Sequence, residues 1–286
     1  LFIKPGITAY NLRVSVSTHI GKVRGNHEDN FYLEGLRLNE IFRNDFSATY
    51  TISDADGMSF AVFDGMGGAA YGEIASEIAV QTMKKYERRL KNAEGMRAVD
   101  QIVTEFVTEA NNSICDMLRE KNCLSGGTTF AMLYFIDGLA KLYYLGDSRI
   151  YMQDEEDLIC LTRDHTLANQ KLDAGIYTEA QAKKSADQHR LTLYVGVDKN
   201  GLGLNADSRP PVALQPGRKF LLCTDGLVDM CSEQEIQDIL SQDYFNEAAV
   251  LVQTAVNYGG IDNVTCIVLE VIPIEESAEL ESDPML

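Results

Sequence analysis

The stretch FAVFDGMGG, residues 60–68, limits the possible folds of this chain more than any other segment. It opens with the apolar run Phe60–Phe63, which is rich in β-formers and predicts a buried strand. The run ends on a carboxylate, Asp64, and three of the next four residues are glycine, which lets the backbone turn sharply and approach whatever Asp64 binds. Apolar side chains at helical spacing follow in residues 69–89. The segment predicts a strand, an acidic site and a helix in direct succession.

A glycine-rich turn between a strand and a helix also suits a phosphate-binding loop. No Gly-Lys-Ser/Thr follows, and the glycine spacing is not GxGxxG, so a nucleotide-binding loop is disfavoured. A tight turn with a capping aspartate would explain the stretch if it stood alone. The pattern recurs, however: Asp147 follows an apolar run in KLYYLGDSR, Asp225 follows one in FLLCTDGL, and Asp262 precedes one in GGIDNVTCIVLEV. This repetition favours a shared site.

Carboxylates at several strand ends can converge on one rim of a sheet. Crowded carboxylates repel one another and shift one another's pKa, so such a rim is tolerated mainly when cations neutralise it. Oxygen ligands of this kind suit hard ions such as Mg²⁺ or Mn²⁺ better than zinc. The sequence therefore predicts a magnesium- or manganese-dependent hydrolase.

The N-terminal part predicts a strand followed by a charged loop. In NLRVSVSTH, residues 11–19, apolar and polar side chains alternate strictly, which is typical of a strand with one exposed face. The next loop gathers Arg24, Glu28 and Asp29 within six residues. In isolation, a surface ion pair between Arg24 and Glu28 is the better interpretation. Beside the strand-end acids, the loop adds two carboxylates and one guanidinium to the candidate site.

Local signals also indicate the fold class. Two β-rich runs flank Asp137-Gly138, a dipeptide that a tight hairpin turn prefers. The expected helices come in pairs instead of alternating with strands, at residues 69–89 and 98–121 and at residues 232–240 and 246–258. Sequential antiparallel strands with paired helices argue against a doubly wound parallel sheet. The predicted fold class is α+β.

Composition excludes several classes of partner. The 286 residues are 45% hydrophobic, ample for a sizeable core, and carry a formal net charge of −18. No Lys/Arg-rich run exists outside the first expected helix, so nucleic acid and anionic membranes are disfavoured. No apolar run approaches the roughly 20 residues of a spanning helix, so no membrane insertion of this segment is expected. Six cysteines without a CxxC pair indicate reduced core residues and a cytoplasmic location.

One catalytic domain is expected over residues 12–272. Residues 1–11 are expected to be an irregular lead-in, and residues 273–286 are expected to be an acidic tail or the start of a linker. Residues 165–190 are polar and helical without a strong apolar stripe, which predicts a small flap. Residues 36–56 show no clear period and are expected to be a surface insertion, either a loop or a partly ordered hairpin.

Seven short motifs occur in the order found in one enzyme family: VRGNHEDN, FAVFDGMGG, GGTTFAMLYF, LGDSRIY, TRDHT, CTDGLVD and GGIDNVT. Together they resemble the PPM family of type 2C metal-dependent Ser/Thr protein phosphatases, and in particular its bacterial branch. Any one of these motifs would be a weak signal, whereas seven in order over nearly the whole chain are specific. The resemblance implies two antiparallel β-sheets packed face to face with paired helices on both sides.

The resemblance also implies a set of metal ligands. Asp64 resembles the carboxylate that bridges two Mn²⁺ or Mg²⁺ ions, and the carbonyl of Gly65 resembles a further ligand to one of them. The acids that complete the shell of the second ion correspond to Glu28, Asp225 and Asp262. A hydroxide that bridges the two ions would attack phosphorus in line.

Two residues are implied to act beside the ions. Arg24 resembles the residue that grips the phosphate oxygens, for which a bidentate guanidinium is well shaped. Asp29 resembles an acid that orients metal-bound water without binding metal itself. Both residues are candidates for catalysis.

Asp147 is left without a role by the two-ion arrangement. In bacterial members of the family the matching acid helps to hold a third, weaker ion together with the acid matching Asp225. The alternative is that Asp147 caps its own turn through Ser148 or Arg149, because short Asp side chains often satisfy nearby backbone donors.

One position departs from the pattern of many family members. Met66 stands where these members, notably the eukaryotic ones, have a histidine proposed to protonate the leaving alkoxide, and Met cannot donate a proton. Bacterial members commonly share the Met, so activity is still expected. What the departure leaves open is which group acts as the general acid. Among the four histidines, His165 is expected to make structural hydrogen bonds and His19, His27 and His189 to lie on the surface.

The function implied is hydrolysis of phospho-Ser and phospho-Thr in proteins by a cytoplasmic monomer that opposes a bacterial Ser/Thr kinase. Its partners would be phosphoprotein substrates and that kinase. The rival is a non-catalytic domain of the same fold that serves as a binding or regulatory module. The presence of all the expected acids disfavours this rival.

Overall fold

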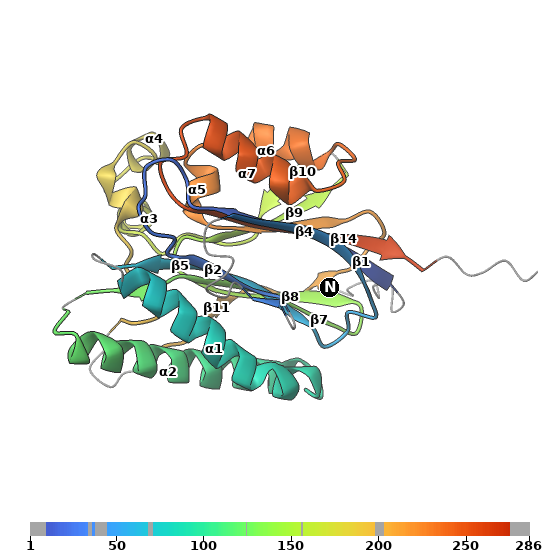
Figure 1. The fold of residues 1–286 in the computed structure, drawn as a ribbon, viewed down its shortest axis with the longest axis horizontal. Coiled ribbons are helices and arrows are strands. Elements are labelled where there is room, and N and C mark those ends of the chain that lie inside the picture. Colours follow the sequence, from blue (N-terminus) through green and yellow to red (C-terminus); the bar gives the residue numbers. More distant parts are fainter. Residues whose placement is uncertain are drawn as a thin grey trace, which may run out of the picture.

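The computed structural model describes residues 10–33, 36–37, 45–67, 71–123, 125–155, 157–197 and 203–274. Its strands form two antiparallel sheets packed face to face, with helices on the outer side of each (Figure 1). The predicted α+β sandwich is confirmed. None of the helices in these ranges is long and apolar enough to cross a membrane. Residues 1–9, residues 275–286 and Gly68 lie outside the described residues.

The strand order places four of the acid-bearing strands in two adjacent pairs. One sheet has the order β10 (Asp157–Cys160), β9 (Arg149–Asp154), β13 (Lys219–Cys223), β14 (Val264–Pro273), β1 (Tyr10–His19) and β4 (Asp45–Ser53). The other has the order β11 (Asp207–Ser208), β8 (Leu139–Leu145), β7 (Phe130–Ile136), β5 (Ser59–Met66), β2 (Asp29–Leu33) and β3 (Leu36–Arg37), with β12 (Val212–Ala213) on β8 and β6 (Gly127–Thr128) on β5. Thus β13 adjoins β14, and β5 adjoins β2.

Two pairs of helices cover the sandwich. Helices α1 (Tyr71–Lys91) and α2 (Met96–Glu120) pack on the sheet that contains β5 (Figure 1). Helices α6 (Glu233–Leu240) and α7 (Glu247–Asn257) pack on the sheet that contains β14. Each sheet is therefore apolar on both faces over much of its area, as its long apolar runs require.

Strand β5 shows how one apolar run serves two layers. Phe60 and Val62 point into the core between the sheets, whereas Ala61 and Phe63 pack beneath α1 and α2. All four side chains are fully buried. Burial of a Phe or Val side chain stabilises a fold by about 1.5–3 kcal/mol, so the strand that ends on Asp64 is firmly anchored.

The polar face of β1 is covered, contrary to the expectation of an exposed face. Ser15 is buried, and its hydroxyl donates to Glu247 of α7 over 3.5 Å. Arg13 and Lys219 place nitrogens 3.1 and 3.2 Å from the same carboxylate, whose residue is only 2% exposed. Opposite charges and hydrogen bonds make this burial tolerable.

The expected insertion at residues 36–56 proves to be largely part of the sheet. Residues 45–53 form β4, which pairs with β1 along its whole length. Phe46, Ala48, Tyr50 and Ile52 pack against the core between the sheets. The expectation of a loop or a partly ordered hairpin is wrong for β4, while residues 38–44 lie outside the described part.

The hairpin between β7 and β8 has the predicted turn. Asp137 has φ 51° and Gly138 has φ 71°, as a two-residue primed turn requires. The strands that it joins pair in register from Phe130 with Leu145 to Ile136 with Leu139. The turn thereby sets the register of β8, the strand that leads to Asp147.

The segment predicted as a flap folds into short helices at one end of the sandwich (Figure 1). These are α3 (Leu167–Asp173), α4 (Glu179–Ala182) and the 3₁₀ helix η1 (Ala186–His189). Asp187 joins them, since its carboxylate accepts hydrogen bonds from Lys171 at 2.5 Å and Tyr177 at 2.9 Å. An isolated bridge between Val195 and Thr128 connects the end of this segment to the sheet.

Candidate active site

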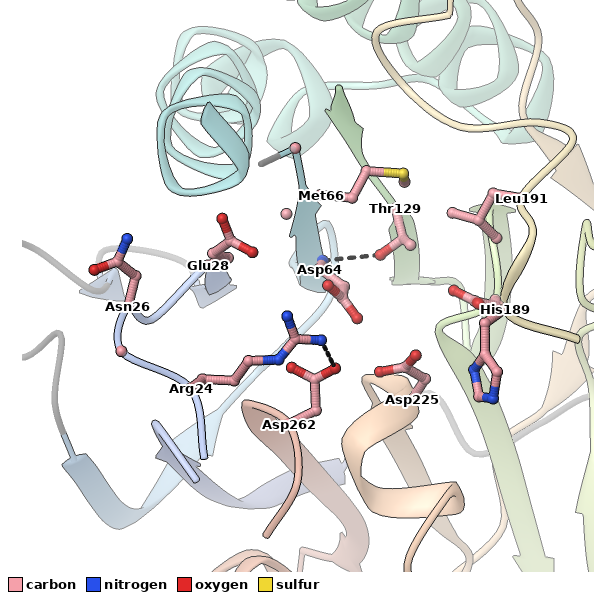
Figure 2. A pocket seen from close by; sticks show the side chains of 14 residues that line it. Arg24, Asn26, Glu28, Asp64, Met66, Thr129, His189, Leu191, Asp225 and Asp262 are labelled. Atoms are coloured by element: carbon pink, nitrogen blue, oxygen red, sulfur yellow. Dashed lines mark hydrogen bonds and ion pairs between the residues drawn. The ribbon is translucent and has the colours of Figure 1, made fainter. Parts of the chain in front are cut away.

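A cavity of about 490 Å³ opens at the end of the sandwich beside the flap segment. All five predicted metal-binding carboxylates line it: Glu28, Asp64, Asp147, Asp225 and Asp262. Figure 2 shows the side chains of Glu28, Asp64, Asp225 and Asp262 directed toward a common centre from separate segments of the chain. The other lining residues are Arg24, Gly25, Asn26, Gly65, Met66, Gly67, Thr129, His189 and Leu191. Motifs that are far apart in the sequence thus meet in one place.

Backbone pairing sets Glu28 and Asp64 next to each other. Strands β2 and β5 align Asp29 opposite Asp64, and the amide of Gly65 donates to the carbonyl of Glu28 over 3.1 Å. On the other side, the amide of Asp64 donates to the Thr129 hydroxyl, and the amide of Thr129 donates to the Asp64 carbonyl, both at 2.8 Å. Asp64 is therefore held by its neighbours on both sides.

Gly65 occupies a position that no larger residue can fill. A Cβ there would lie 2.1 Å from the carbonyl oxygen of Gly72 and 2.6 Å from that of Glu28. Contacts this short with backbone atoms require displacement of the chain. The absence of a side chain lets the start of α1 and the Glu28 loop close around the Gly65 peptide, which lines the cavity.

Asp29 is buried but does not line the cavity. Its Oδ2 accepts hydrogen bonds from Thr224 at 2.9 Å and Thr265 at 2.7 Å. The Thr265 hydroxyl also contacts the Thr18 hydroxyl at 2.7 Å, which in turn contacts Nε2 of His27 at 2.8 Å. Asp29 thus joins the two sheets directly behind the cavity.

Arg24 forms its ion pair with Asp262. The interpretation of Arg24 as a surface ion-pair partner had suggested Glu28 instead. Its Nη2 lies 2.5 Å from Oδ2 of Asp262, and the guanidinium stands at the cavity wall (Figure 2). Asn263, a residue that sequence reasoning missed, fixes this loop by accepting from the Glu28 amide at 2.7 Å. Its own amide group donates to the carbonyls of Ile20 at 2.7 Å and Asn26 at 3.0 Å.

The carboxylates stand in an environment that opposes their ionisation. Burial, followed by the charge of Asp229, raises the pKa of Asp225 to about 6. Burial raises the pKa of Asp29 to about 8, although hydrogen bonds from threonine hydroxyls lower it. Burial and then the charge of Asp225 raise the pKa of both Asp64 and Asp147 well above the usual range. Bound cations would remove this penalty.

The donor set fits divalent metal ions. The Oδ1 atom of Asp225 is buried without a hydrogen-bond partner, which is costly for a carboxylate unless a cation occupies that side. The ligand atoms offered by the five carboxylates and the Gly65 carbonyl are all oxygens, the type that Mg²⁺ and Mn²⁺ prefer. The residues present therefore fit hard divalent ions.

The raised pKa values predict how the metal-free protein responds to pH. A carboxyl group whose pKa is higher in the folded than in the unfolded chain stabilises the fold fully at pH values below the unfolded pKa, about 4. This contribution to the free energy of unfolding is lost as the pH rises through the pKa in the folded protein, about 6 for Asp225 and about 8 for Asp29. With chelator present, the melting temperature should fall by several degrees between about pH 5 and about pH 8. Saturating Mn²⁺ should cancel this fall, and Asp225→Asn should reduce it. Equal melting temperatures at both pH values in chelator would contradict the prediction.

The neighbours of Asp147 are engaged elsewhere. The Ser148 hydroxyl contacts that of Thr129 at 2.6 Å. Arg149 forms two hydrogen bonds with Asp164, at 3.0 and 2.7 Å. Asp147 itself is buried at the cavity. A hydrogen bond from its own backbone amide acts to lower the pKa of its carboxylate, so the turn-cap alternative, which invokes nearby backbone donors, remains to be tested.

One histidine differs from expectation, and another, exposed as expected, lines the cavity. His27 is buried behind the site at 5% exposure, so its assignment to the surface is wrong. His189 is half exposed but lines the cavity, with Nδ1 3.7 Å from Asp229. One ligand atom each from His189, Asp225 and Asp229 lie within 4.8 Å of one another. Asp229 was present in the motif CTDGLVD, but sequence reasoning gave it no role.

His165 makes the structural hydrogen bonds expected of it. Its Nδ1 accepts from the amide of Gly146 at 3.1 Å, and its ring stacks on Tyr144 with centroids 5.2 Å apart. The ring therefore supports the loop that carries Asp147.

A two-sheet sandwich with a cluster of carboxylates at one cavity is the arrangement expected of a metal-dependent phosphatase. The family model for protein phosphatase 2C matches residues 37–256, and the chain belongs to this family. The matched range leaves out Arg24, Glu28, Asp29 and Asp262. The structure brings these four residues to the same site.

Individual relatives agree with this assignment. Protein phosphatase PhpP of Streptococcus pneumoniae is 28% identical over 272 residues, covering 94% of this chain and 100% of PhpP. The serine/threonine protein phosphatase PstP of Mycobacterium tuberculosis is 28% identical over 91% of this chain and 45% of PstP. The Streptococcus agalactiae serine/threonine phosphatase has a similar fold, with a TM-score of 0.77, 24% identity and coverage of 91% of this chain and 99% of that one.

One solved relative contains metal. The catalytic domain of PstP in complex with two manganese ions matches with a TM-score of 0.70 and 26% identity, over 92% of this chain and 99% of that domain.

Proposed function

We propose that this chain hydrolyses phosphoserine and phosphothreonine in proteins with the help of two Mn²⁺ or Mg²⁺ ions. The observation that carries the proposal is the convergence of five carboxylates and one guanidinium on a single cavity in a protein phosphatase 2C fold. The names of the relatives and the two manganese ions of the PstP domain support it. We further propose that the protein acts as a cytoplasmic monomer and opposes a Ser/Thr protein kinase of a bacterial cell.

The proposed ligands divide the cavity between two ions. Asp64 would bridge both, the Gly65 carbonyl would bind one, and Glu28, Asp225 and Asp262 would complete the shell of the other. Bound there, the two ions supply a water acidic enough to act as a nucleophile near neutral pH. Asp147, with Asp225, would hold a third and weaker ion.

The remaining residues bind and orient the reactants. Arg24 stands at the cavity wall, where its guanidinium can donate two hydrogen bonds to phosphate oxygens. Asp29 accepts hydrogen bonds from Thr224 and Thr265 and would orient the nucleophilic water without binding metal itself. Met66 also lines the cavity and cannot donate a proton, so another group protonates the leaving alkoxide.

The substrate class is tested with matched phosphopeptides. In Mn²⁺, the protein should release phosphate from a phosphothreonine peptide much faster than from the same peptide with phosphotyrosine. The non-catalytic rival predicts binding of the phosphothreonine peptide without release of phosphate. Absence of release at saturating Mn²⁺ and peptide would therefore contradict the proposed function.

Arg24→Ala is expected to weaken phosphate binding while leaving metal binding intact. A charge-assisted hydrogen bond contributes about 1.5–3 kcal/mol, so KM should rise about tenfold or more, with some loss of kcat if the contact tightens in the transition state. The substitution removes the guanidinium that pairs with Asp262 and leaves the Asp262 carboxylate free to bind metal. The Mn²⁺ affinity measured by calorimetry should therefore not fall. Unchanged kcat/KM would return Arg24 to the role of a surface ion-pair partner.

A further inference from the structure

A continuous series of buried hydrogen bonds connects His27 to Asp29 by way of two threonines. The link passes through the hydroxyls of Thr18, on β1, and Thr265, on β14, and all four residues are buried. The two threonines are partners in the register of β1 and β14, so the backbone fixes their relative positions. We call the side chains of His27, Thr18, Thr265 and Asp29 the buried network.

The Asp29 end of the buried network lies next to the proposed metal ligands. Asp29 directly follows Glu28, and the pairing of β2 with β5 places it opposite Asp64. Thr224, whose hydroxyl donates to Asp29 at 2.9 Å, directly precedes Asp225. The orientation of the Asp29 carboxylate is therefore set within one residue of three of the ligands.

The carboxylate fixes the direction of every hydrogen bond in the buried network. A carboxylate oxygen only accepts, so the Thr265 hydroxyl donates to Oδ2 of Asp29 at 2.7 Å. A hydroxyl has a single hydrogen, so Thr18, whose oxygen lies 2.7 Å from that of Thr265, donates to it. The hydrogen of Thr18 is then used, and the same oxygen accepts from Nε2 of His27 at 2.8 Å. The geometry thus requires a proton on Nε2 of His27.

The donor from His27 decides where the Thr265 hydrogen points. While His27 donates to Thr18, the Thr18 oxygen has its hydrogen bond, and Thr265 keeps its hydrogen on Asp29. Without that donor, the buried Thr18 oxygen needs another hydrogen, because a buried polar atom without a partner is costly. The Thr265 hydroxyl can supply one by turning away from Asp29. The carboxylate would then keep the bond from Thr224 but lose the one from Thr265.

We propose that His27 is a positioning residue for Asp29, acting through Thr18 and Thr265. By directing the Thr265 hydrogen onto the carboxylate, His27 keeps Asp29 in the orientation that holds the nucleophilic water. The inference rests on the proposed function, in which Asp29 orients that water. A buried histidine that merely satisfied its own hydrogen bonds would affect stability but not kcat.

The kinetic test removes the donor and then restores it. In Mn²⁺, His27→Leu should lower kcat on a phosphothreonine peptide by about tenfold, the loss typical of removing a group that supports a metal site. KM should stay within about twofold of the wild-type value, because Arg24 is untouched. His27→Gln should bring kcat back to within about threefold of wild type, because the amide nitrogen of Gln can donate to Thr18 in place of Nε2.

A double-mutant cycle tests whether His27 acts through Thr18. Thr18→Val removes the hydroxyl and should lower kcat about as much as His27→Leu, and combining the two should lower it no further. Losses that multiply would show independent effects and overturn the proposal. Ser15→Ala is the matched control, because Ser15 is also buried on β1 but contacts Glu247 and does not line the cavity. It should lower the melting temperature without lowering kcat.

Nuclear magnetic resonance reads the direction of the buried network without turnover. In the Mg²⁺-loaded protein, the nitrogen spectrum of isotope-labelled histidine should show a proton on Nε2 of His27. A bare Nε2 would mean that Thr18 donates to the ring and Thr265 to Thr18, which would overturn the proposal. An unchanged kcat in His27→Leu would also overturn it and leave the proposed function intact. No hydrolysis by the wild-type protein in saturating Mn²⁺ would instead contradict the proposed function.

Discussion

Replacing Asp64 with Asn is expected to lower kcat/KM on a phosphothreonine peptide by at least about a thousandfold, because this carboxylate would contact both ions that activate the nucleophile. Asn has the same shape but lacks the negative charge. Calorimetric titration should show the loss of tight Mn²⁺ binding together with the loss of turnover. Asp116→Asn on α2 is the matched control, since that side chain is 68% exposed and does not line the cavity.

The same variant should be more stable than the wild-type protein when metal is absent. Burial and the charges of Asp225, Asp29 and Asp147 raise the pKa of Asp64, so an ionised Asp64 opposes folding of the metal-free chain near neutral pH. Melting curves in chelator should therefore show a higher melting temperature for Asp64→Asn. A lower melting temperature with normal Mn²⁺ binding would show that Asp64 has a structural role, contrary to the proposal.

Asp147→Asn is expected to lower kcat by about ten- to a hundredfold, the loss typical of removing a supporting group at a metal site. Two ions should still bind tightly, and a weaker third should be lost from the calorimetric titration. The melting temperature should change little, because Ser148 and Arg149 keep their own partners, Thr129 and Asp164.

Asp164→Asn provides the contrasting variant. It leaves the partly buried guanidinium of Arg149 without its carboxylate, so it should lower the melting temperature while three ions still bind. If Asp147→Asn behaved in this way, with normal kcat and unaltered metal stoichiometry, Asp147 would be a turn residue and nothing more.

Much of the fold follows from local patterns. The apolar runs of β5 and β7, the Asp137-Gly138 turn and the paired helices were sufficient to predict the α+β class, whereas the two-sheet sandwich was implied by the resemblance of the ordered motifs to a family. The strand β4 was missed although its signal is present: Phe46, Ala48, Tyr50 and Ile52 alternate with polar residues. Because Ala is small and the flanking residues are polar, the alternation is weak, and only pairing with β1 makes the segment a strand.

The candidate site was also accessible from the sequence, because its acids occur at the ends of recognisable strands and in ordered motifs. The supporting residues were not. Asn263 matters through its contact with Glu28, which is remote in the chain, and His27 through its contact with Thr18 on the preceding strand; neither pairing is encoded by a local pattern. Burial of the polar face of β1 likewise depends on Glu247, which accepts a hydrogen bond from Ser15 only because α7 packs on the sheet.

The central claim is that the acidic cavity is a metal site that hydrolyses phosphothreonine. Its most direct test is phosphate release from a phosphothreonine peptide by protein stripped with a chelator and shown by elemental analysis to be free of metal, before and after Mn²⁺ is added. The account predicts no release above the blank from the stripped protein and recovery of turnover with Mn²⁺. Sustained turnover by the stripped protein would contradict it.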